Sequence, residues 1–350
     1  MPFSPTYCAI TGRAATALYA LFRHLGTKGT LLAPANVCYA ALYPALYAGW
    51  NITFCDVNPH DGNITLPIIE EAVSETNPQA VLVPHMYGEP VSDFEGIVSL
   101  CKDKNIVLIE DAASAMGASA AYPVGSLSDY CIYSTGYAKP VDAGFGGMLT
   151  SEHDPLNWFE DQVRDLPLLN SQIEQTETLF SRLYRVLRNN PDRKLDVEIY
   201  RAFYRGSRDA FLYNLAPHQK ETVLEAVSHL DEVVAQRRSI LHSCEKVLTT
   251  SGFMDAPFFE GMYPYSPGAV PWRLTFFVAP QAHEAFIKAC LGKGLPVSDW
   301  YPCVTPMFEN YNQYPGALSM EQRIVNFPLT QKTAECVCPQ LSDILRSIKL

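Results

Sequence analysis

The chain has 350 residues, of which 48% are hydrophobic and 18% are charged, a composition typical of a packed globular protein and unlike that of a disordered chain. The formal net charge of −11 argues against a nucleic-acid-binding surface. No stretch of about 18 consecutive apolar residues occurs, so no membrane span is predicted, and the N-terminus lacks the pattern of a signal peptide. We therefore expect a cytoplasmic protein. Its ten scattered cysteines predict free thiols, mostly buried, and no metal site.

Short apolar runs alternate with helical patterns in the first half of the chain. Continuous apolar strands that are separated by helices predict an α/β fold with a mostly parallel sheet, covered on both faces. The predicted strands are 30–33, 52–55, 80–83, 106–109, 130–133 and 147–150, and the predicted helices are 13–25, 38–48, 66–75 and 93–103.

The second half begins with a helical pattern and ends with a mixed one. Pro217 favours the first turn of a helix, so 217–248 is predicted as one long helix or as two helices end to end. The predicted elements are helices over about 155–250, a connection at 255–271, a strand at 272–278, and helices at 281–293 and 333–349. We expect a large domain at 1–234 and a smaller α+β domain at 235–350.

The most informative pair of residues is Lys139 and Asp111. Ligands gather at the carboxyl ends of parallel strands, and His85, Asp111 and Ser134 each directly follow an apolar run. Lys139 follows Ser134 by five residues, in a loop rich in Gly, Ala and Pro. Pyridoxal phosphate (PLP) needs an amine for covalent attachment and an anion that keeps its pyridine nitrogen protonated. The pair therefore predicts a PLP site, although a solvated loop lysine and a helix-capping aspartate are the simpler alternatives.

Further motifs follow in a consistent order along nearly the whole chain. They are Thr11-Gly12-Arg13-Ala14-Ala15, Pro34-Ala35-Asn36, Asp56-Val57-Asn58-Pro59, Pro84-His85-Met86-Tyr87-Gly88-Glu89-Pro90, Glu110-Asp111-Ala112-Ala113, Gly144-x-Gly146-Gly147 after Lys139, Tyr213-Asn214 and Tyr301-Pro302. Together they resemble the DegT/DnrJ/EryC1/StrS aminotransferases, PLP enzymes of fold type I that act mostly on keto-sugar nucleotides. The resemblance implies a large domain with a mostly parallel, seven-stranded sheet between helices, followed by a smaller C-terminal α+β domain.

The resemblance also implies a role for each candidate near the cofactor ring. Lys139 is expected to form the internal aldimine and to move the proton between the substrate carbon and the cofactor. Asp111 is expected to pair with the pyridine nitrogen. At the position where the family commonly stacks an aromatic residue on the ring, this chain has Cys38, with Tyr39 beside it. Ser114 replaces the longer Gln or His that usually hydrogen-bonds the ring oxygen.

The phosphate group of the cofactor is expected at the start of the first helix. Gly12 and Arg13 open that helix, whose free N–H groups favour an anion. The family usually has threonine where Arg13 stands, so its guanidinium either grips the phosphate or pairs with an acid elsewhere. Ser134 is expected to add a hydroxyl and Asn214 to reach in from the neighbouring subunit of a homodimer; an ordinary strand-end serine and a turn residue are the alternatives.

His85, Tyr87 and Tyr301 are the candidates for substrate contacts, with a histidine satisfied by backbone groups as the alternative for His85. Ala216 stands where the family has an arginine after the asparagine, and the chain begins only about a dozen residues before Gly12. By the resemblance, the family's N-terminal segment helps to build the substrate pocket and the dimer contacts, so we expect these to differ here.

The predicted activity is transamination from an amino acid, expected to be L-glutamate, to a keto-sugar nucleotide or a related keto compound. Retention of Lys139 argues against the dehydratase branch of the family, in which that lysine is replaced. Another PLP reaction, such as elimination, dehydration or decarboxylation, is an alternative, and a non-catalytic sensor is a further one. A nicotinamide dehydrogenase is excluded, because no Gly-x-Gly-x-x-Gly follows the first strand.

Overall fold

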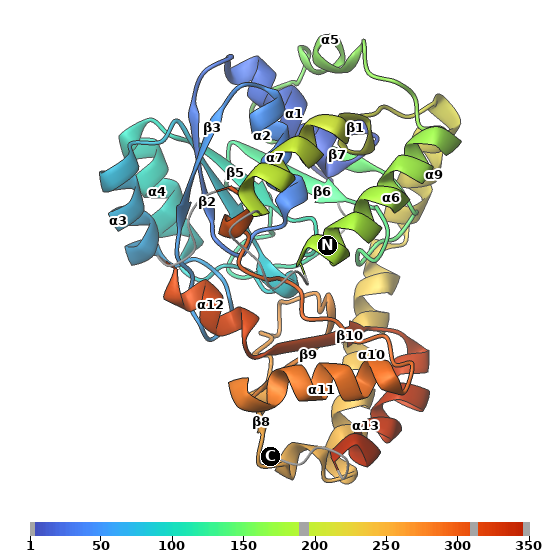
Figure 1. The fold of residues 1–350 in the computed structure, drawn as a ribbon. Coiled ribbons are helices and arrows are strands. Elements are labelled where there is room, and N and C mark those ends of the chain that lie inside the picture. Colours follow the sequence, from blue (N-terminus) through green and yellow to red (C-terminus); the bar gives the residue numbers. More distant parts are fainter. Residues whose placement is uncertain (1–3, 189–195, 309–313, 346–350) are drawn as a thin grey trace.

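The computed structural model describes residues 4–188, 196–308 and 314–345. A large body surrounds a seven-stranded sheet, and a smaller body with a three-stranded sheet lies below it (Figure 1). The large sheet has the order β1-β7-β6-β5-β4-β2-β3. Its strands are β1 (Tyr7–Thr11), β2 (Thr30–Pro34), β3 (Asn51–Cys55), β4 (Ala80–Pro84), β5 (Val107–Asp111), β6 (Tyr130–Ser134) and β7 (Gly147–Ser151).

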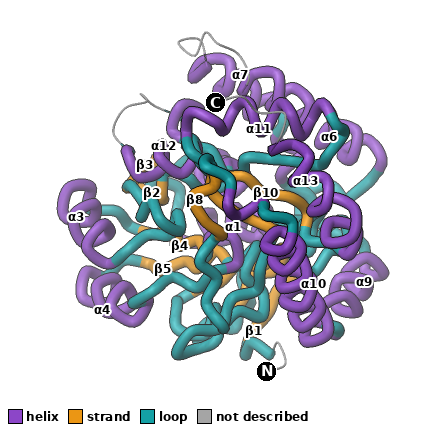
Figure 2. Tube along the Cα trace, turned by 90° about the horizontal axis from the view of Figure 1, so that it is seen from below, coloured by secondary structure: helices purple, strands orange, loops and turns teal. Residues whose placement is uncertain are grey.

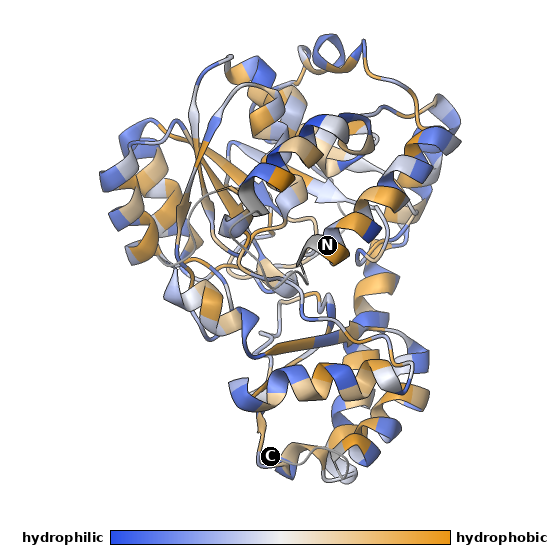
Figure 3. Ribbon diagram, viewed as in Figure 1, coloured by the Kyte–Doolittle hydropathy of each residue, from blue (hydrophilic) through white to orange (hydrophobic). Residues whose placement is uncertain are grey.

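The sheet is mostly parallel, as predicted. Strands β2 to β6 pair in parallel, whereas β7 runs antiparallel to both β6 and β1. Every residue of β4, β6 and β7 is buried, which explains why these strands read as continuous apolar runs. In Figure 3 several strands in the middle of the large sheet carry the hydrophobic colour, whereas the helices around them mix hydrophilic and hydrophobic residues.

The strand order determines on which face of the sheet the first four helices lie. The crossover from β2 to β3 proceeds along the sheet in the opposite direction to the crossovers from β3 to β4 and from β4 to β5. Because such crossovers are right-handed, α2 (Tyr39–Tyr47) lies on one face with α1 (Ala14–Leu25), which it contacts. The helices α3 (Leu66–Thr76) and α4 (Phe94–Lys104) lie together on the other face. Each of these helices begins and ends within one or two residues of its predicted bounds.

The next segment is helical, with breaks. Its helices are α5 (Phe159–Val163), α6 (Ser171–Arg188), α7 (Asp196–Gly206), α8 (Arg208–Phe211), α9 (Pro217–Ser228) and α10 (Leu230–Thr250). The long helical pattern after Pro217 thus forms two helices that meet at His229, the second of the two alternatives. Pro217 occupies the first turn of α9, where its missing N–H needs no acceptor.

The smaller body contains an antiparallel sheet of order β10-β9-β8, packed against helices (Figure 2). Its elements are β8 (Phe259–Met262), β9 (Arg273–Val278), α11 (Pro280–Gly292), β10 (Ile324–Pro328) and α13 (Cys338–Leu345). The segment 255–271, predicted as a connection, contains β8, so that prediction is wrong there. The terminal helix is a π-helical turn over Thr333–Val337 followed by α13, and 346–349 lie outside the described residues.

More than one segment of the chain passes between the two bodies. The proposed boundary at 234/235 falls inside α10, whose first turn packs in a cluster with Ala112 and Tyr213, whereas Leu241 and Leu248 pack in the smaller body. Later, 303–308 and 314–317, the second of which includes part of α12 (Pro315–Glu321), return to the core of the large body. The division into two domains is therefore not a single cut, and its boundary stays a proposal.

Two further features concern the environment of the chain. Among the described residues, no helix combines the length and the apolarity that a membrane span requires. All ten cysteines are free thiols, and seven of them are buried.

Candidate active site

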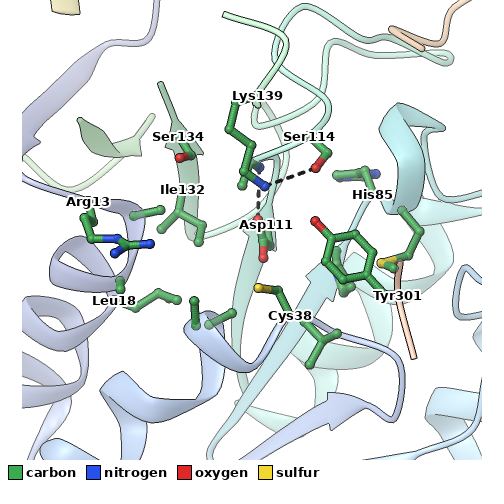
Figure 4. A pocket seen from close by; sticks show the side chains of 18 of the residues that line it. Arg13, Leu18, Cys38, His85, Asp111, Ser114, Ile132, Ser134, Lys139 and Tyr301 are labelled. Atoms are coloured by element: carbon green, nitrogen blue, oxygen red, sulfur yellow. Dashed lines mark hydrogen bonds between the residues drawn. The ribbon is translucent and has the colours of Figure 1, made fainter. Parts of the chain in front are cut away.

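A cavity lies at the carboxyl ends of β4, β5 and β6, where the sequence places its candidate residues. Nine of the twelve predicted site residues line it: Arg13, Cys38, His85, Tyr87, Asp111, Ser114, Ser134, Lys139 and Tyr301 (Figure 4). We call it the Asp111 cavity. A second cavity shares Lys139, Ser134 and Tyr301 with it and is also lined by Trp272 and Arg273. We call this one the Arg273 cavity.

Lys139 extends into the Asp111 cavity from the loop after β6. A turn holds this loop, in which the Lys139 N–H donates to the Gly136 carbonyl at 3.2 Å and the Ala138 N–H donates to Asp142 Oδ2 at 2.8 Å. The ammonium group Nζ donates to Ser114 Oγ at 3.3 Å. Burial lowers the pKa of Lys139 below that of an ordinary lysine, although Cys38 and Asp111 partly offset this effect. A lysine in this environment is a better nucleophile at neutral pH than a solvated one.

Asp111 ends β5 and turns its carboxylate into the same cavity. Its Oδ1 accepts a hydrogen bond from the Ala113 N–H at 2.9 Å. Burial raises the pKa of Asp111, and the positive charge of Lys139 is the largest influence that opposes the rise. The capping bond and the site role are compatible, because the second carboxylate oxygen remains available for another partner.

The predicted phosphate-binding residues lie in different situations. The Gly12 N–H donates to the Tyr213 carbonyl at 3.2 Å, and a Cβ at Gly12 would lie 2.2 Å from that oxygen. Gly12 is therefore needed for the close approach of Tyr213, and its own N–H is already engaged. The free N–H groups of the helix start belong to the first turn of α1, where Ala14 and Ala15 line the cavity together with Ser134.

Arg13 pairs with an acidic residue, which is the second of the two possibilities that the sequence allows for its guanidinium. Its Nη1 lies 2.6 Å from Glu177 Oε1 of α6 and donates to the Ala210 carbonyl at 2.7 Å. Arg13 still lines both cavities. Asn214 lines neither cavity of its own chain, and its Oδ1 accepts hydrogen bonds from Leu215 N–H and Thr11 Oγ1. The contact of Asn214 with a neighbouring subunit stays a prediction.

His85 is fixed by two partners in the core. Its Nδ1 accepts a hydrogen bond from the Val91 N–H at 3.0 Å, and its Nε2 lies 2.9 Å from Glu110 Oε1. An Nδ1 that accepts must be unprotonated, so the ring is neutral and donates from Nε2. Because both ring nitrogens are engaged, His85 offers the cavity a ring surface and no hydrogen-bonding group.

The aromatic candidates take different positions around the Asp111 cavity. The Tyr87 hydroxyl accepts a hydrogen bond from the Tyr301 N–H at 3.0 Å, and Tyr87 is fully buried. Tyr301 stacks on Trp272 with 5.2 Å between ring centroids and, like Cys38, points into the cavity (Figure 4). Tyr39 does not line the Asp111 cavity; it packs in an aromatic cluster with residues of α2, α6 and α8 and lines the Arg273 cavity.

The residues present fit pyridoxal phosphate. A nucleophilic amine at Lys139, a buried carboxylate at Asp111, and an anion site at the start of α1 beside Ser134 face one cavity. Its remaining walls are largely apolar, as a cofactor ring requires, and include Val37 and Ile132. Sequence reasoning missed these walls and also the residues that distinguish the Arg273 cavity, such as Glu177, Trp272 and Arg273. The one available signal was an arginine within a strand that otherwise reads as apolar.

The fold and this set of residues define the class of fold-type-I PLP proteins. The sequence model of the DegT/DnrJ/EryC1/StrS aminotransferase family matches residues 4–338. The chain belongs to this family, and the predictions of family and fold are confirmed.

Individual relatives are distant. The chain is 27% identical over 158 residues to GDP-perosamine synthase of Caulobacter vibrioides, an alignment that covers 43% of this chain and 42% of that protein. The chain thus matches less than half the length of that curated relative. Among solved structures, Helicobacter pylori PseC, an aminotransferase involved in the biosynthesis of pseudoaminic acid, has a TM-score of 0.75 at 14% identity. The comparison covers 98% of this chain and 88% of that one.

A second solved structure is NtdA of Bacillus subtilis with bound cofactor PMP, with a TM-score of 0.70 at 14% identity. That comparison covers 98% of this chain and 74% of the other. At these identities the two structures show a shared fold, and the substrates of the relatives remain properties of those proteins.

Proposed function

We propose that this protein is a PLP-dependent aminotransferase that moves an amino group from an amino acid, L-glutamate, to a keto-sugar nucleotide. The observation that carries the proposal is the buried amine of Lys139 beside the buried carboxylate of Asp111, in one cavity at the carboxyl ends of β5 and β6. Family membership, and a relative named as the synthase of an amino-sugar nucleotide, support the direction of the reaction.

Each proposed residue has a chemical task. Pyridoxal phosphate supplies an aldehyde that captures amines and a ring that accepts electrons from the substrate carbon. Lys139 provides the amine for covalent attachment and, when released, carries a proton to and from the substrate carbon. Its lowered pKa favours the neutral form that attachment and removal of the proton require. Asp111 provides a negative charge for the protonated ring nitrogen.

The other residues are proposed to hold the phosphate, to orient Lys139 or to form the cavity walls. The first turn of α1 and the Ser134 hydroxyl hold the phosphate through N–H and O–H donors. Ser114 keeps Lys139 Nζ directed into the cavity, while Cys38, His85 and Tyr301 form walls. Burial raises the pKa of Tyr301, so its phenol stays protonated and can donate a hydrogen bond at neutral pH.

The proposal also covers the cellular location, the oligomeric state and the domain boundary of the protein. We propose a cytoplasmic homodimer in which Asn214 of one subunit reaches the phosphate site of the other, and a domain boundary within α10. The small-molecule partners are an amino donor and a keto acceptor.

The proposal is tested by the donor half of the reaction. The purified protein, loaded with PLP, is mixed with L-glutamate in the absence of any acceptor, and 2-oxoglutarate is measured. One equivalent per site is expected, followed by amination of a keto-sugar nucleotide in a panel of GDP-, UDP- and dTDP-linked compounds. A protein that holds PLP but releases no 2-oxoglutarate from L-glutamate would point to another amino donor or to another PLP reaction, such as elimination or decarboxylation.

A further inference from the structure

Arg273 is a cation beside Lys139 that has no carboxylate partner among the described residues. It opens β9 and lines the Arg273 cavity together with Lys139, Ser134 and Tyr301. Its guanidinium carbon lies 4.3 Å from the centre of the Trp272 ring, and Lys139 Nζ lies 6.0 Å from the same centre. The two cationic groups therefore share one aromatic neighbour. The indole N–H of Trp272 donates to the Ala138 carbonyl at 2.7 Å and so ties this neighbour to the lysine loop.

The hydrogen-bonding capacity of Arg273 is not used up. Its Nη1 donates to Ser298 Oγ at 3.1 Å, whereas its Nε is buried and has no hydrogen-bond partner. Within residues 4–188, 196–308 and 314–345, no carboxylate lies within 4.0 Å of this guanidinium. A buried donor without an acceptor is costly, and a partly buried cation gains most from a carboxylate that can accept two parallel hydrogen bonds.

Two other arginines each have a partner that Arg273 lacks among the described residues: a carboxylate for Arg13 and an acceptor for the Nε hydrogen of Arg237. Arg13 is paired with Glu177 at 2.6 Å. Arg237 donates from Nε to the Pro271 carbonyl at 2.8 Å and from Nη2 to the Trp272 carbonyl. Burial lowers the pKa of Arg273, and the groups that oppose this effect are phenols, with Tyr301 first. Among the residues that the structure describes, none of the groups that raise this pKa is a carboxylate.

An amino donor that reacts at Lys139 comes close to Arg273, because both residues line the Arg273 cavity. An α-amino acid carries its carboxylate two bonds from its amine, and that amine has to arrive at the site of Lys139 in order to react. A planar guanidinium beside the lysine loop matches both the charge and the forked geometry of such a carboxylate.

We propose that Arg273 binds a carboxylate of the amino donor and thereby orients the donor amine toward Lys139. The inference rests on the proposed function for the identity of the donor. Arg273 is then a substrate-binding residue of the donor half-reaction, supplied by the small sheet to a cavity that the large sheet builds. The diphosphate of a sugar nucleotide is the competing anion.

The test is a binding measurement that requires no amino transfer. Glutarate has the two carboxylates of glutamate without the amine, and its affinity for the PLP-loaded protein is measured by calorimetry. Loss of a charge-assisted, forked contact predicts binding weaker by about thirtyfold or more in Arg273→Gln and by about tenfold in Arg273→Lys. Inorganic pyrophosphate, the probe for the acceptor side, is expected to bind all three proteins within about a factor of two.

Controls separate this result from misfolding and from failure of the proposed function. Arg238→Gln removes an exposed guanidinium that donates to the Ala269 carbonyl at 3.0 Å outside both cavities, and it should leave glutarate binding unchanged. All variants should retain the visible absorption of the bound cofactor. Glutarate binding that is absent from the wild type, or equal in Arg273→Gln, overturns the inference, as does a selective loss of pyrophosphate. Because glutarate does not react, each of these results is independent of whether the protein transaminates.

Discussion

The buried pair of His85 and Glu110 provides a quantitative test of how the cavity wall is built. Both side chains are 2% exposed. Glu110 accepts hydrogen bonds from His85 Nε2 at 2.9 Å, from the Gly125 N–H at 3.1 Å and from Ser128 Oγ at 2.6 Å. Glu110→Ala leaves three donors without an acceptor: the buried His85 Nε2–H and Ser128 hydroxyl, and the part-buried Gly125 N–H. Each buried donor that loses its acceptor costs roughly 1–3 kcal/mol. Since the Ser128 hydroxyl can turn to another acceptor, we expect a total loss of about 3–5 kcal/mol.

Glu110→Gln should be mild because His85 is neutral. The glutamine oxygen can still accept from His85 Nε2 and Gly125 N–H, and its NH₂ can donate to Ser128 Oγ once that hydroxyl rotates. We expect a loss of about 1 kcal/mol, since no charge pair is broken. The melting temperature should therefore fall by roughly 10 °C for the alanine variant and by only a few degrees for the glutamine variant.

The assay is thermal and urea-induced unfolding of the PLP-loaded proteins. Glu232→Ala is the matched control, because Glu232 forms a second histidine–glutamate pair, 3.3 Å from His229, but is 81% exposed on its side chain. Exposed pairs contribute little, so no measurable shift is expected. Equal losses for Glu110→Gln and Glu110→Ala would refute the reasoning, since they would mean that the charge of Glu110 matters and that His85 is an imidazolium.

Three further predictions concern the cofactor site and the turn before α1. Asp111→Asn should slow the glutamate half-reaction by about a hundredfold or more, measured by stopped-flow absorbance, because a neutral amide stabilises a protonated ring nitrogen poorly; an unchanged rate would remove Asp111 from the site. Gly12→Ala should destabilise the protein by about 1–3 kcal/mol or more in urea unfolding, since the new Cβ would lie 2.2 Å from the Tyr213 carbonyl oxygen. Gly136→Ala, whose Cβ would meet only a side-chain oxygen at 3.4 Å, should be nearly neutral, and similar losses in both variants would contradict this explanation. Because burial lowers the pKa of Lys139, the rate at which cofactor-free protein captures PLP should rise with pH and reach its plateau at a lower pH than for a free lysine. A plateau at the pH of a free lysine would show a solvated amine.

The sequence predicted the main strands and helices because each of them is an apolar pattern in a local stretch of the chain. It did not predict β1, a five-residue edge strand whose burial is only partial and whose single partner is the distant β7. It also missed β8 and β10, because such short strands gain their stability from neighbours in the small sheet. Pairing over long separations is not encoded in the local pattern.

The same limit applies to the site. Strand ends place Asp111 and Ser134 in one cavity, and a local motif identifies Lys139, so these residues could be predicted from the sequence. The direction of Arg13 could not, since it depends on Glu177, which lies 164 residues away on α6. Arg273 escaped notice because it begins a strand in the other sheet, and only folding brings it next to the lysine loop.

The central claim is that Lys139 binds the cofactor in the Asp111 cavity. The most direct measurement is the visible absorption spectrum of the protein after PLP is added, followed by borohydride reduction and peptide mass spectrometry. We predict a visible band and a cofactor mass on the peptide that contains Lys139. The band should be shifted or lost in Lys139→Ala and unchanged in Lys288→Ala, whose lysine pairs with Glu284 on the surface. A cofactor mass on another lysine, or no band in the wild-type protein, would contradict the account.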